Sequence, residues 1–360
     1  MCDVPALRFP EFTGEWKSVH LEDVAEFQKK RISSDLLNNN NYISTENILQ
    51  NFEGIQYSSS IPTNTNVIEY QKGDILLSNI RPYLKKVWFS DRKGGCSADV
   101  FVLRGDKCDQ HFLYYVIASD RFINYVMSGV KGVKMPRGDK NQMKKYAFSI
   151  PTNTEQRKIA KFLSMLDERI KLQNKIIEKL QSLIKGIAQN VARNNKPNIR
   201  LSECLECSSS TLQESDVCEN GTYPVYGANG IVGYLDNYNA EKEAVYIIKD
   251  GSGVGTVSYV TGKCSATGTL NTLQAKEGYS LQYLYYMLKV FNFEPYKTGM
   301  AIPHIYFKDY GKAKIFCPSY TEQLKYVGVL STIDNKLSAE QSILTDLSLQ
   351  KQYLLHQMFI

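Results

Sequence analysis

Apolar residues between Ile159 and Val191 recur at alternating steps of four and three positions for nearly five heptads. This spacing predicts a long helix with a coiled-coil seam. The same spacing returns 167 residues later, between Tyr326 and Met358. Two helices of roughly 40 residues, each about 60 Å long at about 1.5 Å per residue, are therefore expected to pack antiparallel against each other.

One polar residue stands near the middle of each predicted seam, at the equivalent positions Gln173 and Glu340. A polar residue in a seam commonly fixes the register of the two helices at some cost in stability. We interpret the pair as such a register device, and the alternative is a water-exposed gap in the seam.

The two helix starts carry the same sequence signals. Pro151 is followed by Thr152 and, three residues later, Glu155, and Pro318 is followed by Ser319 and Glu322 in the same spacing. A hydroxyl residue followed three positions later by glutamate is typical of a capping box, in which the two side chains satisfy free amide groups of the first turn. We therefore expect a helix to begin directly after each proline, with a capping box at both starts.

The repeat extends beyond the helices and covers most of the chain. Cys96-Ser97-Ala98 returns as Cys264-Ser265-Ala266, and Leu113-Tyr114-Tyr115 returns as Leu284-Tyr285-Tyr286. A period of about 170 residues indicates a tandem duplication, because solenoid repeats are only about 20 to 50 residues long. Strand-like runs surround one apolar helix in each half, which predicts an α+β protein. The expected architecture is two duplicated α/β domains joined by an antiparallel coiled coil with pseudo-two-fold symmetry. The predicted boundaries are 1–150, 151–194, 195–317 and 318–360.

Composition narrows the class of protein further. The 360 residues carry a formal charge of +6, contain eight cysteines and include no apolar run of membrane-spanning length. The first residues lack the pattern of a signal peptide. We therefore expect a cytoplasmic protein without membrane contact, whose cysteines stay reduced.

Basic residues collect after the apolar helix in each half, around 131–145 and 297–314. A solvated face explains most charge runs, but a positive loop at the same place in both copies is what contacts with DNA phosphates would require. Polar residues that follow strand-like runs extend these loops, although several could be ordinary turn residues. The DNA-contact candidates are Asn79, Arg81, Lys85, Lys86, Lys131, Lys134 and Arg137 in the first half, and Tyr226, Asn229, Lys249, Ser252, Lys297, His304 and Lys308 in the second.

No motif in the sequence indicates catalysis or metal binding. Cys204 and Cys207 lack the second pair of ligands that a zinc site needs. The glycine-rich segment 250–255 lacks the following helix of a phosphate-binding loop. We therefore expect no catalytic residue, metal or cofactor in this chain.

The motifs at the helix starts resemble a known family. The matching residues are Pro151, Glu155-Gln156, Lys158 and Leu166-Asp167, repeated as Pro318, Glu322-Gln323, Lys325 and Ile333-Asp334. In duplicate and in this order they resemble the specificity subunit of type I restriction-modification enzymes. The resemblance extends to WKSVHLEDV in the first half and TYPVYGANGIVGY in the second, and so covers essentially the whole chain.

This resemblance implies a non-catalytic subunit with two target recognition domains. Each domain would read one half of a bipartite, asymmetric target in double-stranded DNA, and the helices would set the spacer between the halves. Two methyltransferase subunits would dock on the helices, near Phe162, Leu172 and Ile176, and restriction-translocase subunits would join for cleavage. S-adenosylmethionine, ATP and Mg²⁺ would then bind to those partners.

Two other functions compete with this interpretation. A self-contained DNA methyltransferase would need a methyl-donor glycine loop and an Asn/Asp-Pro-Pro-aromatic motif, and the sequence contains neither. A coiled-coil adaptor without a nucleic-acid role would not need positive loops at matching places. Binding of DNA on a filter separates the adaptor from the other two.

Overall fold

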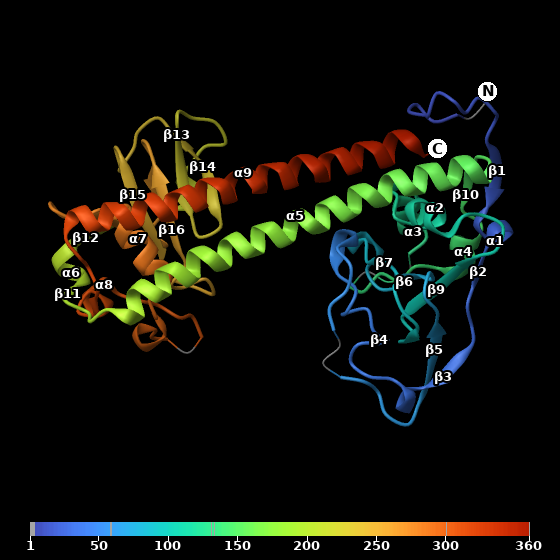
Figure 1. Ribbon diagram of the computed structural model, residues 1–360, viewed down its shortest axis with the longest axis horizontal. Helices are drawn as coiled ribbons and strands as arrows, with labels where there is room; N and C mark the ends of the chain where they lie inside the picture. Colours follow the sequence, from blue (N-terminus) through green and yellow to red (C-terminus); the bar gives the residue numbers. More distant parts are fainter. Residues whose placement is uncertain (1–3, 58–59, 131, 133, 300, 360) are drawn as a thin grey trace. The chain divides into compact units, whose positions relative to one another are not determined.

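The computed structural model describes residues 4–57, 60–130, 132, 134–299 and 301–359. The chain forms two compact units, of which unit 1 comprises Met1–Leu172 and Leu344–Ile360 and unit 2 comprises Gln173–Ile343. Both units contain a globular part and portions of the two long helices α5 (Asn153–Asn194) and α9 (Tyr320–Met358), each of which Figure 1 shows as one continuous ribbon. Within the described residues, neither these nor any shorter helix has the length and apolar character needed to cross a membrane.

Both long helices begin where the sequence predicts, directly after Thr152 and Ser319. The predicted capping boxes are wrong. Glu155 is 1% exposed, and its carboxylate accepts hydrogen bonds from the side chains of Arg8 and Trp16 instead of from the helix start. In the second copy the Ser319 hydroxyl donates directly to the Glu322 carboxylate, at 3.0 Å.

The coiled-coil seam is present in both units. Every predicted seam position in α5 and α9 is buried or partly buried. In unit 1, Leu354 and Met358 share a core with Ile159 and Leu163, which shows that the helices run antiparallel there. The Lys351 ammonium also lies 2.5 Å from the Asp167 carboxylate.

Gln173 and Glu340, the polar pair of the seam, lie in unit 2 and are joined by hydrogen bonds, with no gap between them. The Gln173 side-chain amide donates to the main-chain carbonyl of Glu340, at 2.9 Å, and to its carboxylate. Lys336 approaches the same carboxylate at 2.5 Å, and its ammonium, with Gln173, lowers the pKa of Glu340. These bonds favour the interpretation of the pair as a register device over a water-exposed gap.

In the globular part of unit 1, the described residues form two four-stranded sheets and four short α-helices. One sheet has the order β2 (Ala25–Phe27), β9 (Val100–Gly105), β6 (Ile75–Ser78) and β7 (Val87–Phe89). The other has the order β3 (Arg31–Ser33), β5 (Asn66–Tyr70), β8 (Gly94–Cys96) and β4 (Tyr42–Ile43). The remaining elements are β1 (Lys17–His20), which pairs with β10 (Ala147–Ile150), and the helices α1 (Leu21–Val24), α2 (Gln110–Ile117), α3 (Asp120–Ser128) and α4 (Lys140–Lys144).

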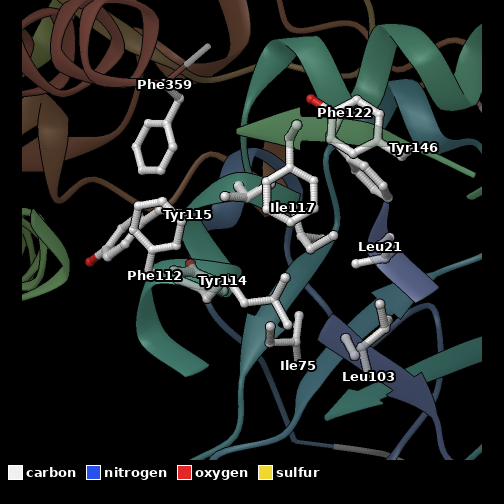
Figure 2. Close-up of a cluster of buried hydrophobic side chains, with 14 of the residues drawn as sticks. Leu21, Ile75, Leu103, Phe112, Tyr114, Tyr115, Ile117, Phe122, Tyr146 and Phe359 are labelled. Atoms are coloured by element: carbon white, nitrogen blue, oxygen red, sulfur yellow. The ribbon is translucent and has the colours of Figure 1, made fainter. Parts of the chain in front are cut away.

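The main core of unit 1 lies where α2 and α3 pack beside the strands. Figure 2 shows Leu21, Ile75 and Leu103 together with Phe112 of α2, all of them fully buried. Phe359, which follows α9, joins the same core, and its ring centroid lies 5.3 Å from that of Phe112. A residue at the end of the second copy therefore completes the hydrophobic core of unit 1.

Unit 2 repeats this plan. Its larger sheet has the order β12 (Leu205–Ser209), β18 (Leu270–Ala275), β15 (Glu243–Ile248) and β16 (Val257–Thr261). Its smaller sheet has the order β14 (Gly230–Leu235), β13 (Tyr223–Gly227) and β17 (Ser265–Ala266). The remaining elements are β11 (Ile199–Arg200), which pairs with β19 (Lys314–Ile315), and the helices α6 (Leu201–Cys204), α7 (Leu281–Lys289) and α8 (Phe307–Tyr310).

The strand register is the same in the two copies. Ile75 pairs with Leu103 across β6 and β9, and Val245 pairs with Leu273 across β15 and β18. Short 3₁₀ turns connect the elements at Ser34–Leu36, Gln50–Phe52, Pro82–Leu84, Glu214–Asp216 and Glu294–Tyr296. The predicted α+β class, duplicated domains and paired long helices are confirmed.

The glutamine of each Glu-Gln motif joins a long helix to its globular part. The backbone N–H of Asp109, which caps α2, donates to the Gln156 side-chain oxygen at 2.8 Å. The backbone N–H of Ser280, which caps α7, donates to Gln323 in the same way at 2.9 Å. Because each bond ties the start of a globular helix to the start of a long helix, the repeated motif has a structural role in both units.

Candidate nucleic-acid interface

Three main-chain hydrogen bonds gather distant candidates of unit 1 at the end of β6. The N–H of Asn79 donates to the carbonyl of Asp99 at 2.8 Å, and the N–H of Gly138 donates to the carbonyl of Asn79 at 3.1 Å. The N–H of Arg81 donates to the carbonyl of Pro136 at 2.8 Å. We call residues 79–81, 97–99 and 136–138 the first junction, which brings the predicted residues Asn79, Arg81 and Arg137 together.

Unit 2 contains the same three bonds at the end of β15. The N–H of Lys249 donates to the carbonyl of Thr269 at 3.0 Å, and the N–H of Ile305 donates to the carbonyl of Lys249 at 2.9 Å. The N–H of Gly251 donates to the carbonyl of Pro303 at 3.0 Å. We call residues 249–251, 267–269 and 303–305 the second junction, which brings the predicted residues Lys249 and His304 together.

The hairpin of β13 and β14 reaches the second junction through its main chain. The N–H of Thr267 donates to the carbonyl of Tyr226 at 2.9 Å. The Tyr226 ring packs against Tyr246, and burial raises the pKa of its hydroxyl. Asn229, in the exposed turn of this hairpin, and Ser252, exposed after Gly251, complete the candidates near this junction.

Several cations of the first half already have partners within the chain. Lys85 lies 2.5 Å from the Asp120 carboxylate, and the Lys86 ammonium donates to the carbonyl of Thr45 at 2.8 Å. The Arg137 guanidinium lies 2.5 Å from the carboxylate of Asp99. These three side chains would have to share or exchange partners in order to meet a phosphate.

Two other cations of the first half are exposed. Arg81 and Lys134 have no side-chain hydrogen bond or ion pair with any described residue. The third lysine of the predicted basic loop, Lys131, lies outside the described residues. Among the described candidate cations of this half, Arg81 and Lys134 are therefore the ones whose charge is most available to a ligand.

In the second half, the basic candidates are also partly paired. His304 lies 2.6 Å from the carboxylate of Asp250, and Lys297 lies 2.5 Å from that of Glu294. Lys308 is exposed, and its ammonium lies 5.3 Å from the centre of the Tyr306 ring. Asp99 and Asp250, the acids that pair with Arg137 and His304, were not among the predicted residues, because isolated aspartates in strand-end loops carry no sequence signal.

Two candidates, Arg81 and Lys85, have a left-handed backbone, and Arg81 is the one that belongs to the first junction. Arg81 has a φ of +50°, in the left-handed region, and the residue at the equivalent position of the second junction is Gly251, with a φ of +95°. The left-handed conformation costs a residue with a side chain about 1 to 2 kcal/mol, whereas glycine adopts it freely. Such strain often marks a side chain with a function, which supports Arg81 as the leading contact residue of the first junction.

No metal-ligand cluster occurs in the part of the chain that the structure describes. Groups of three or more His, Cys, Asp or Glu side chains that could hold an ion are absent from these residues. Cys204 is buried at the end of α6, and burial raises its pKa to about 12. A thiol with such a pKa stays protonated at neutral pH and is a poor nucleophile.

Comparison with known proteins identifies the family. A family model described as the type I restriction modification DNA specificity domain matches the chain twice, over residues 13–182 and 197–348. The chain belongs to this family. The two matches each include one junction, so both copies of the specificity domain contain the same strand-end arrangement.

Curated relatives of this specificity-domain chain carry consistent names. The type I restriction enzyme EcoprrI specificity subunit of Escherichia coli is 27% identical over 116 residues, which cover 32% of this chain and 29% of that protein. The putative type I specificity subunit S.MgeORF438P of Mycoplasma genitalium is 25% identical over 279 residues, which cover 70% and 71%. The aligned part thus spans less than a third of the E. coli relative's own length.

Solved structures share the fold of this family member. The crystal structure of a type I restriction-modification S subunit from M. genitalium superposes with a TM-score of 0.70 at 19% identity, over 99% of each chain. A chain from a study of complex assembly in the type I R-M system superposes with a TM-score of 0.53, over 94% of this chain and 96% of that one. At this identity the likeness shows that the fold is shared.

Proposed function

We propose that this chain is the DNA-reading subunit of a type I restriction-modification complex and performs no chemistry itself. Each specificity domain reads one half of a bipartite target in double-stranded DNA. The observation that carries the proposal is the duplicated junction, in which identical main-chain bonds present different side chains in the two copies. Phosphate contacts position a protein on DNA and base contacts specify the sequence, so two differently equipped junctions suit two different half-sites.

Partner subunits supply the chemistry in this proposal. Two methyltransferase subunits dock on the long helices and bind S-adenosylmethionine, and restriction-translocase subunits bind ATP and Mg²⁺. Exposed apolar side chains on α5, such as Leu172 at 59% exposure and Phe162 at 39%, support a docking surface there. Phe162 is covered in part by Phe9, whose ring centroid lies 5.9 Å away.

Mapping methylated adenines tests the proposal. The chain and its cognate methyltransferase are expressed together in a host without other adenine methylation, and the modified positions are read from the genome. We expect one sequence with two fixed halves and a fixed spacer. Methylation that is independent of this chain, or a target with only one fixed half, would contradict the proposal.

Arg81→Gly is expected to raise stability and weaken DNA binding at the same time. Glycine removes the left-handed strain, so the free energy of unfolding rises by about 1 kcal/mol. Loss of one phosphate contact makes the dependence of log K on log salt concentration less steep by about 0.9. Denaturant unfolding and binding titrations at several salt concentrations measure the two effects, with the chain in complex with its methyltransferase for the second.

Two control variants separate charge from backbone conformation. Arg81→Lys keeps the charge and should keep the salt dependence of the parent protein. Asn64→Gly changes an exposed left-handed residue, with a φ of +52°, without loss of charge and should also leave the salt dependence unchanged. If Arg81→Gly kept the original salt dependence, Arg81 would not contact DNA.

A further inference from the structure

An exposed, large apolar side chain lies at the same place beside each junction. Met135 is 50% exposed and Ile302 is 57% exposed, at positions 167 residues apart. Each comes directly before the proline whose carbonyl accepts a hydrogen bond from the strand end, Pro136 in the first junction and Pro303 in the second. These bonds place the backbone next to Met135 and Ile302 beside the polar and cationic residues of the junctions.

A glycine with a positive φ lies shortly before each of these side chains. Gly132 has a φ of +90° and Gly299 a φ of +87°, each three residues before the apolar residue. A Cβ at Gly299 would lie 2.3 Å from the carbonyl oxygen of Ile302, so this position requires glycine. The residue just before the apolar one differs between the copies, Lys134 in the first and Ala301 in the second. Both copies therefore keep a large apolar side chain while the residues around it vary.

Exposure alone would not identify a role, because single apolar side chains are common on protein surfaces. On a surface that contacts DNA, however, an apolar side chain makes no favourable contact with the charged phosphates. It is stabilised only when it leaves water and packs against the bases. Methionine and isoleucine are among the residues that minor-groove proteins insert between base pairs, which partly unstacks and kinks the duplex.

We propose that Met135 and Ile302 are wedge residues, each of which inserts its side chain into a base-pair step of the half-site that its own junction reads. This inference rests on the proposed function and deepens it. Insertion makes recognition depend on how easily a step unstacks, and pyrimidine–purine steps unstack most readily. Each half-site would then carry a preference at a position without a hydrogen bond from the protein.

The test uses 2-aminopurine, a base analogue whose fluorescence rises when it loses its stacking neighbours. The complete chain with its methyltransferase is bound to duplexes of the mapped target, with the analogue at successive positions outside the methylated adenine. We expect a rise at one step of each half-site. Met135→Ala should abolish the rise in one half-site only, and Ile302→Ala should abolish it in the other half-site only.

Matched variants make the outcome specific. Met135→Ile and Ile302→Met keep a large apolar side chain and should keep both signals. Leu36→Ala removes another exposed apolar side chain of unit 1, 72% exposed, and should change neither. Affinity should fall about tenfold or less in the alanine variants, because unstacking offsets part of the gain from insertion.

Three results would overturn the wedge. They are the absence of any rise with the parent complex on a duplex that it binds selectively, an unchanged rise in both alanine variants, and release of the methyltransferase from either alanine variant on gel filtration. The last result would assign these side chains to protein docking. If the parent complex showed no preference for the mapped duplex, the proposed function itself would fail, and that failure is visible in the binding curve before any fluorescence is read.

Discussion

Replacement of Glu155 by alanine is expected to lower the free energy of unfolding of unit 1 by about 2 to 4 kcal/mol. The buried Glu155 carboxylate accepts from two nitrogens of Arg8, at 2.7 and 2.8 Å, and from the Trp16 ring nitrogen at 3.3 Å. Removal of the buried carboxylate leaves the Arg8 guanidinium, whose side chain is 14% exposed, and the Trp16 ring N–H without their partner, which accounts for the size of the effect. Thermal unfolding followed by calorimetry should show the transition of unit 1 lowered by roughly 10 °C.

The duplication supplies a matched control for this substitution. Glu322 stands at the equivalent position of α9 but is exposed, and its carboxylate accepts only from the Ser319 hydroxyl among the described residues. Glu322→Ala should therefore change the free energy of unfolding by no more than about 1 kcal/mol. Equal losses in the two variants would mean that the glutamate acts through the helix start alone, without the contacts to Arg8 and Trp16.

Duplication of one heptad in both long helices is expected to lengthen the spacer of the DNA target by about three base pairs. The inserted copies are residues 171–177 after Ile177 and residues 338–344 after Leu344. Seven residues add about 10 Å to a helix, and base pairs along DNA are about 3.4 Å apart. The half-sites should stay the same, because both junctions are unchanged. Mapping of methylated adenines with the variant measures the spacer and both half-sites in one experiment.

The register of the seam decides whether this variant folds. Each inserted heptad carries its own copy of Gln173 or Glu340, so every seam glutamine still has a glutamate partner. A variant with the heptad in α5 alone leaves one glutamine without a partner and should lose stability and methylation. An unchanged spacer with both insertions, or altered half-sites, would disprove the idea that the helices set the spacing.

Local sequence patterns predicted the helices well and their first turns poorly. The seam from Leu163 to Val191 follows from a period of 3.5 residues, which depends only on neighbours along the chain. The capping box failed because Arg8, 147 residues away, competes for the carboxylate of Glu155 and forms a stronger, charge-assisted pair. The four residues that define the motif give no indication of a contact with a residue so distant in the sequence.

The candidate site could also be predicted only in part. The basic loops were visible because both copies carry them, and the structure brings Arg81 beside Arg137 in one and Lys249 beside His304 in the other. The partners of these residues were not predictable. The Lys86 ammonium donates to the main-chain carbonyl of Thr45. Every residue has such a carbonyl, so the sequence does not indicate which one is bound. Which candidates touch DNA stays a prediction.

The main-chain bonds of the junctions also bear on how new target sequences can arise. A backbone N–H or carbonyl is present whatever the side chain, proline excepted for the donor, so these bonds hold the loops in place without constraining which residues stand there. Asn79 and Arg137 of one copy already correspond to Lys249 and His304 of the other. If the junctions contact bases as proposed, substitutions at such positions alter which bases are preferred at little risk to folding, and one half of the target can change while the other half continues to be read.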